Sequence, residues 1–188
     1  MSNFEFIFSL FALLLGFSLA EVLGGLAKAT KLRRKVRIGW LTPLLAAFVL
    51  LDILSFWSGI WQARELIPMT YATLVFGLAV TGLYYLAAAI IFPDDPEEFR
   101  DFDDYYFAHR RQVLTAVWLC NSTAFPAMYV LAGRPPHAMT LAMIGLYTVL
   151  VAAAVFSARK WLNAAALGGL IAIYALEVIL SALSARGS

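Results

Sequence analysis

Residues 39–62 read GWLTPLLAAFVLLDILSFWSGIWQ, and Asp52 is the only charged residue among them. An α-helix rises about 1.5 Å per residue, so this run would span about 36 Å as a helix. The hydrocarbon core of a bilayer is about 30 Å thick, and about 20 apolar residues cross it. The run is therefore predicted to be a membrane-spanning helix with one carboxyl group near its centre.

The same apolar character extends over the whole chain of 188 residues, of which 62% are hydrophobic and 14% charged. Soluble domains are about 45–50% apolar and about 25% charged. The apolar segments predict six spans, at residues 4–27, 39–62, 66–92, 112–132, 138–158 and 161–184. We therefore expect an all-α polytopic membrane protein, a single transmembrane domain over residues 1–188. This excludes a soluble enzyme and a folded extramembrane domain.

The basic residues predict an orientation. Eleven of the 14 Lys and Arg residues fall in the connections 28–38, 93–111 and 159–160. Cytoplasmic loops carry an excess of Lys and Arg, so these three connections are predicted to lie inside and both termini outside. The small size and short loops favour a bacterial cytoplasmic (inner) membrane. The net charge of +2 is too small to indicate a nucleic-acid partner.

Asp52 carries the clearest functional signal. Ionisable residues at membrane depth are costly, and they commonly mark the path of an ion or a proton. Ser55, Gly59 and Gln62 share one helical face with Asp52, which suggests a polar lining. The alternative is a carboxyl group that only joins helices through hydrogen bonds. Both interpretations stay open, with a slight preference for the functional one.

Two further carboxylates lie at other depths. Glu21 falls in the inner half of the first span and Glu177 in the outer half of the last. Together with Asp52 they form a staggered set that could relay protons or guide a cation. The structural alternatives are that Glu21 reaches toward the basic run at 28–37 and that Glu177 reaches the outer headgroups.

Uncharged polar residues on other spans could complete a polar interior. Thr81 belongs to a face of small and hydroxyl residues within 66–92, and Asn121 precedes Pro126 within 112–132. Polar faces on several helices exceed what packing alone requires. The expected ion path consists of Asp52, Glu21, Glu177, Ser55, Asn121 and Thr81.

The sequence lacks the residues that several kinds of membrane protein need for their chemistry. A retinal protein needs a lysine within a span, and haem usually needs histidine at depth. The two histidines, His109 and His137, lie near span ends, and no H-E-x-x-H motif is present. We therefore expect neither an enzyme nor a resident cofactor or metal.

The segment 94–109 is acidic and aromatic. Phe99, Phe102, Tyr106 and His109 recur at helical spacing between acidic residues. This pattern predicts a short amphipathic helix on the inner membrane surface. Pairing of its acids with the basic run at 28–37 is the favoured interpretation. The alternative is a partner surface or a divalent-cation site, since carboxylate oxygens suit hard cations. That surface would comprise Asp101, Asp103, Asp104 and His109.

Two stripes of small residues predict association. They comprise Gly16, Ala20 and Gly24 near the start of the chain, and Ala164, Gly168 and Ala172 near its end. Such spacing allows close helix packing and favours a homo-oligomer.

For function we expect a small channel or transporter for a cation or protons, centred on Asp52. The alternative is a non-transporting partner or sensor subunit that acts through segment 94–109.

Overall fold

The computed structural model describes residues 3–95, 99 and 101–186. It contains six helices: α1 (Asn3–Leu32), α2 (Leu41–Gln62), α3 (Tyr71–Ala89), α4 (Phe102–Ala132), α5 (Ala138–Phe156) and α6 (Lys160–Arg186). All six are long and apolar enough to cross a membrane. The predicted all-α fold with six spans is confirmed, and the chain is a multi-pass membrane protein.

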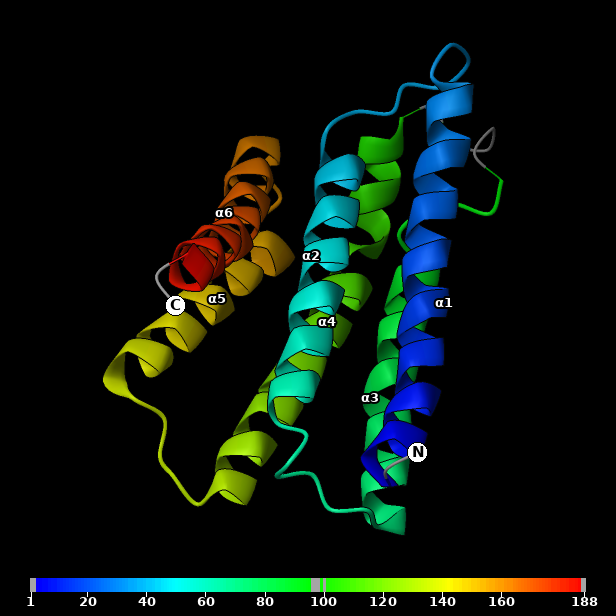
Figure 1. Cartoon of the computed structure of the whole chain (residues 1–188). Helices are drawn as coiled ribbons and strands as arrows, with labels where there is room; N and C mark the ends of the chain where they lie inside the picture. The colour runs from blue at the N-terminus through cyan, green and yellow to red at the C-terminus, as the bar shows by residue number, and fades with distance from the viewer. Residues whose placement is uncertain (1–2, 96–98, 100, 187–188) are drawn as a thin grey trace.

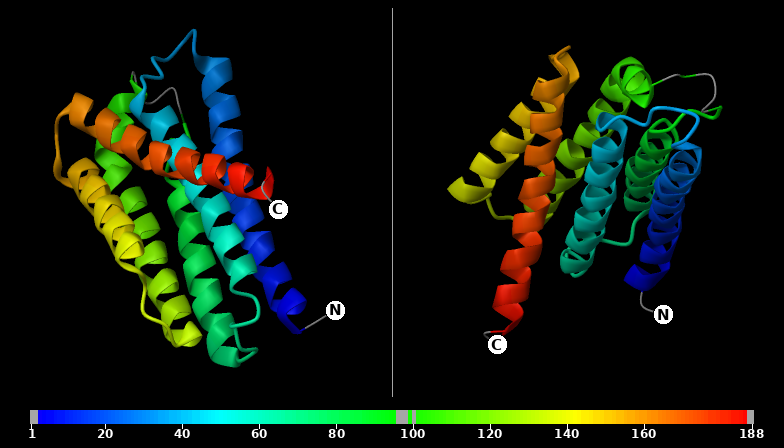
Figure 2. Two further views of the ribbon diagram at one scale, coloured as in Figure 1. Left: turned by 60° about the vertical axis from the view of Figure 1, so that its left-hand side comes forward. Right: turned by 90° about the horizontal axis from the view of Figure 1, so that it is seen from above.

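The helices pack side by side, with α2 and α4 at the centre of the bundle (Figure 1). Helix α1 lies against α3 and α2, whereas α6 packs on α2 and α5. In Figure 2, α6 is steeply inclined to the other helices. The largest fully buried side chains include Phe48, Ile53 and Leu114 from α2 and α4. These two helices therefore supply part of the interior in which a buried polar group would sit.

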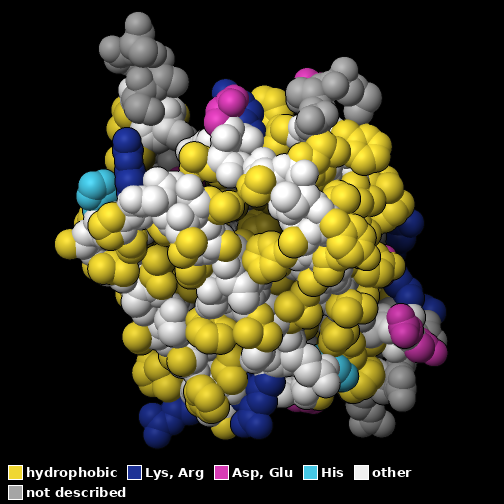
Figure 3. All heavy atoms as spheres, turned by 90° about the horizontal axis from the view of Figure 1, so that it is seen from below, with side chains coloured by type: hydrophobic (Ala, Val, Ile, Leu, Met, Phe, Trp, Pro, Cys, Tyr) yellow, Lys and Arg dark blue, Asp and Glu magenta, His cyan; other side chains and the backbone are white. Residues whose placement is uncertain are grey.

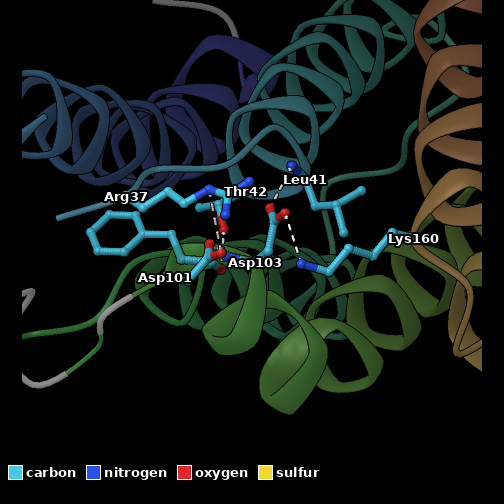
Figure 4. A network of polar contacts seen from close by, with 7 residues as sticks. Arg37, Leu41, Thr42, Asp101, Asp103 and Lys160 are labelled. Carbon is cyan, nitrogen blue, oxygen red and sulfur yellow. Dashed lines mark hydrogen bonds and ion pairs between the residues drawn. The ribbon is translucent and has the colours of Figure 1, made fainter.

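One end of the bundle is joined by polar contacts between three segments distant in sequence (Figure 4). Asp103 accepts a hydrogen bond from the backbone N–H of Leu41 at 3.1 Å and pairs with Lys160 at 3.4 Å. Arg37 pairs with Asp101 at 3.7 Å. The starts of α2, α4 and α6 are thus held together, so the three basic connections meet at the same end.

The structure does not support the short amphipathic helix predicted within 94–109. Helix α4 begins at Phe102 and continues as one helix of 31 residues to Ala132. The Asp101 side chain caps it by accepting a hydrogen bond from the Asp103 backbone N–H at 2.8 Å. Phe102 and Tyr106 are each only 1% exposed, so they pack inside the bundle rather than on a lipid surface. Two of the acids in this segment, Glu97 and Glu98, lie outside the described residues.

Two other helix boundaries differ from the sequence prediction. Helix α1 continues past residue 27 to Leu32, and α3 begins at Tyr71 rather than near residue 66. The later start of α3 has a local cause, because the Thr70 side chain caps it by accepting a hydrogen bond from the Thr73 backbone N–H at 3.2 Å. Thr70 itself is extended, so the chain turns into the helix at this residue.

Candidate functional site: a buried carboxylate held by four helices

Asp52 lies inside the protein and does not face lipid. Its residue is 1% exposed, and Phe48, Val49, Ile53 and Phe56 around it on α2 are buried as well. Helix α2 packs against α1, α3, α4 and α6, and the side chain at this position is surrounded by protein. A buried carboxyl group needs hydrogen-bond partners, because an unpaired polar group is costly in an apolar interior.

Four residues from four other helices supply these partners. The Tyr84 hydroxyl of α3 donates to Asp52 Oδ2 at 2.6 Å. The Asn121 amide of α4 lies 3.0 Å from each carboxylate oxygen. The Tyr147 hydroxyl of α5 donates to Oδ1 at 3.2 Å, and the Tyr174 hydroxyl of α6 donates to the same oxygen. Every helix except α1 therefore meets at one carboxyl group, which we call the Asp52 cage.

Asn121 is itself held in place. Its Nδ2 lies 3.1 Å from the Val117 carbonyl oxygen one turn earlier and 3.0 Å from the Tyr147 hydroxyl. The amide is therefore fixed both to its own helix and to α5. This preorganisation means that the cage does not depend on the carboxyl group alone for its shape.

No Lys, Arg or His side chain contacts Asp52 among the described residues, so its partners are neutral. A phenol can donate or accept, whereas an ionised carboxylate only accepts. Rotation of one hydroxyl would thus let the cage surround Asp52 with or without a proton. The arrangement is chemically suited to a carboxyl group that gains and loses a proton.

Glu177 and Ser55 form a second contact one turn away from the cage. The Ser55 hydroxyl donates to Glu177 Oε2 at 3.2 Å. Ser55 follows Asp52 on α2 by three residues, and Glu177 follows Tyr174 on α6 by three residues. The α2–α6 interface therefore carries two successive polar pairs, and Glu177 is the exposed member. The structure brings together Asp52, Ser55, Asn121 and Glu177 from the predicted path.

Glu21 and Thr81 do not belong to this group. Glu21 is exposed on α1, in a recess of about 170 Å³ that Lys28 and Asp94 also line. Thr81 is buried, but its hydroxyl donates to the Gly77 carbonyl at 2.7 Å within α3. The structure therefore places Asp52 and Glu177 at the α2–α6 interface, about one helical turn apart. The third predicted carboxylate, Glu21, lies away from them on α1.

The predicted acidic surface is largely engaged in internal contacts. Asp101 and Asp103 hold the helix ends together (Figure 4). The His109 ring stacks on Tyr105 with 4.1 Å between ring centroids, while Asp104 is exposed. No group of three His, Cys, Asp or Glu side chains within the described part of the chain could hold a metal ion. The four residues do not converge on a common ligand position.

None of the three tyrosines is among the site residues predicted from the sequence, although the sequence holds a signal for them. Tyrosine in membrane proteins is enriched at the two interfaces, yet Tyr147 and Tyr174 fall near the middle of α5 and α6. A buried tyrosine hydroxyl usually has a hydrogen-bond partner. Phenols at depth in separate spans, together with one carboxyl group, could have suggested the cage.

Comparison with known proteins adds no assignment: no family model, curated protein or solved structure matches this chain.

Proposed function

We propose that this protein is a small membrane transporter for protons or a small cation and that Asp52 is its central binding group. The observation that carries the proposal is the Asp52 cage, in which neutral donors from four helices surround one buried carboxyl group. A group that binds and releases a proton needs this type of surrounding, because both of its states must be accommodated.

A purely structural role for Asp52 has less support. Hydrogen bonds between membrane helices contribute about 0.6 kcal/mol on average, and uncharged side chains make them as well. An ionisable residue at this depth adds a cost that an amide would avoid. The carboxyl group is therefore better explained by a use that needs its ionisation.

Occlusion of Asp52 favours a carrier over an open channel. Asp52 is 1% exposed, and it lines neither the recess beside Glu21 nor a larger pocket between α1, α2, α3 and α4. Access to it would require a helix to move. We assign this movement to α6, whose contacts with α2 include the Tyr174 and Glu177 pairs. Glu177 would then be the access group for Asp52.

The alternative of a partner or sensor subunit is less favoured. It depends on segment 94–109 as a free surface, whereas Asp101 and Asp103 form ion pairs within the molecule.

We further propose the bacterial inner membrane as the location, with the basic connections inside and both termini outside. A homo-oligomer is proposed on the small-residue stripes.

Proteoliposomes containing purified protein test the transport proposal. An imposed proton, Na⁺ or K⁺ gradient should dissipate faster than in empty vesicles, as read by a dye trapped inside. Asp52→Asn should reduce the flux at least tenfold, since the amide keeps the shape but cannot release a proton. Asp104→Asn is the matched control, because Asp104 is exposed outside the cage. Wild-type vesicles that match empty ones for all three ions would overturn the proposal, as would full flux in Asp52→Asn.

A further inference from the structure

A pocket of about 260 Å³ lies between α1, α2, α3 and α4. Three phenylalanine rings line it, Phe11, Phe56 and Phe76, and Ile60, Val80 and Met128 are among the aliphatic residues. Ile67 and Pro68 of the α2–α3 connection also border it, which places it toward that end of the bundle. Figure 3 views the molecule from this end, where the surface is hollowed near its centre and ringed mainly by hydrophobic side chains.

The pocket offers little polar recognition. Its hydroxyl groups belong to Thr73 and Thr81, which donate to the carbonyl oxygens of Pro68 and Gly77, each at 2.7 Å. The hydrogen of each hydroxyl group is therefore already bonded to a backbone carbonyl oxygen. Specific polar groups fix the orientation of polar ligands in most binding sites, and this pocket has no free donor on a side chain. Its chemistry suits a hydrocarbon.

We infer that this pocket binds a small hydrophobic molecule, and, resting on the transport function proposed above, that such a molecule is a substrate whose transport is coupled to the protons or cation bound at Asp52. An apolar cavity of about 150 Å³ holds one benzene molecule. In proportion, 260 Å³ holds roughly ten carbon atoms, about the size of a fused two-ring aromatic. The acyl chain of a membrane lipid is longer, so the pocket would take only part of it.

The pocket and the Asp52 cage share a wall. Phe56 lines the pocket, and its ring packs against Tyr84 with 5.1 Å between centroids. The Tyr84 hydroxyl in turn donates to Asp52 at 2.6 Å. One aromatic layer thus separates a bound molecule from the carboxyl group. A ligand that displaces Phe56 would shift Tyr84 and so change a hydrogen bond to Asp52, which is a direct route for coupling.

Photolabelling of the purified protein in nanodiscs tests the pocket. The probe is phenyl trifluoromethyl diazirine, and mass spectrometry reads the label on Phe76 and Met128. We expect labelling that saturates, that excess naphthalene competes away, and that falls at least tenfold in Ala72→Phe. Ala72 lines the pocket, whereas Ala79→Phe is the matched control on the same helix because Ala79 is exposed outside it. Ala127→Phe fills the pocket from α4 and should repeat the loss.

Two results would overturn the inference about the pocket. One is labelling that rises linearly with probe and is the same in all variants. The other is equally strong, competable labelling of Phe76 and Met128 by a phospholipid with a diazirine in its acyl chain, since the pocket would then hold lipid. Neither result would contradict proton flux in proteoliposomes, which tests the proposed function separately.

The coupling between ligand binding in the pocket and transport is measured in a separate experiment. Naphthalene should change the proton flux of wild-type vesicles at least twofold, and Asp52→Asn, which lies outside the pocket, should keep the saturable labelling. Saturable labelling without any ion flux would overturn the proposed function and the substrate assignment, but not the binding site. Flux that naphthalene does not alter would overturn the substrate assignment alone.

Discussion

The tyrosines of the Asp52 cage can be tested one hydroxyl at a time, because phenylalanine keeps the ring. Tyr84→Phe removes the hydrogen bond to Asp52 Oδ2 but retains the packing on Phe56. We expect it to lower the free energy of unfolding by about 1 kcal/mol, the typical size of a buried hydrogen bond. The measurement is thermal or denaturant unfolding of the purified protein in detergent.

Its neighbour provides the control for this experiment. Tyr85 lies on the same helix with 38% of its surface exposed, and Tyr85→Phe should change stability by less than about 0.5 kcal/mol, as surface substitutions usually do. Equal effects from the two variants would show that the Tyr84 hydroxyl contributes nothing through Asp52.

At the scale of the element, the start of α2 depends on a glycine. Gly39 has φ +66°, and a Cβ there would lie 2.2 Å from Asp103 Oδ1. Gly39→Ala therefore strains the backbone and displaces the carboxylate that binds Leu41 and Lys160. A left-handed residue other than glycine costs about 1–2 kcal/mol, and the lost contacts add to this. We expect a clear loss of stability in detergent unfolding.

A substitution at Gly133 separates the backbone strain from the loss of the Asp103 contacts. Gly133 has φ +62° after α4, and nothing lies within 4 Å of an added Cβ. Gly133→Ala should therefore show the backbone strain alone, a smaller loss than Gly39→Ala. If the two variants lose the same stability, the contact between the α1–α2 connection and Asp103 is not a source of stability.

At the scale of the whole molecule, the orientation can be tested by cysteine labelling in intact cells. Single cysteines at Arg64 and Arg134 should react with an impermeant maleimide from outside, because both lie opposite the basic connections. A cysteine at Arg33 should react only after permeabilisation. Cys120 is the single cysteine of the sequence, so Cys120→Ser gives a background without a native thiol. Labelling at Arg33 in intact cells would contradict the proposed topology.

The association of whole molecules has a separate test. Gly16 and Gly24 share the stripe on α1, and nothing lies within 4 Å of a Cβ added to either. Gly24→Leu should therefore leave the protomer folded and weaken any oligomer seen by native mass spectrometry. Gly145→Leu is the control, since Gly145 on α5 has equal space outside the stripe. A wild-type protein that is monomeric in several mild detergents would contradict the prediction.

Composition and periodicity alone determined the class of this protein and its six spans, and they singled out Asp52 as a candidate site. Long apolar runs have few alternatives to helices across a bilayer, since every backbone polar group must be satisfied within the segment. The same reasoning failed for segment 94–109, because helical spacing of aromatic residues does not distinguish a surface helix from the first turns of a buried one. Only the packing of Phe102 and Tyr106 decided this.

Only the tertiary structure decided which polar residues meet. Asp52 and Tyr174 are separated by 122 positions in the chain, and their contact depends on how α6 crosses α2. Depth along each helix can be estimated from sequence, but the rotation of one helix against another cannot, because it is set by the packing of many side chains at once. Sequence therefore placed Glu21, Asp52 and Glu177 at their depths, whereas packing put Glu177 beside the cage and Glu21 in a separate recess.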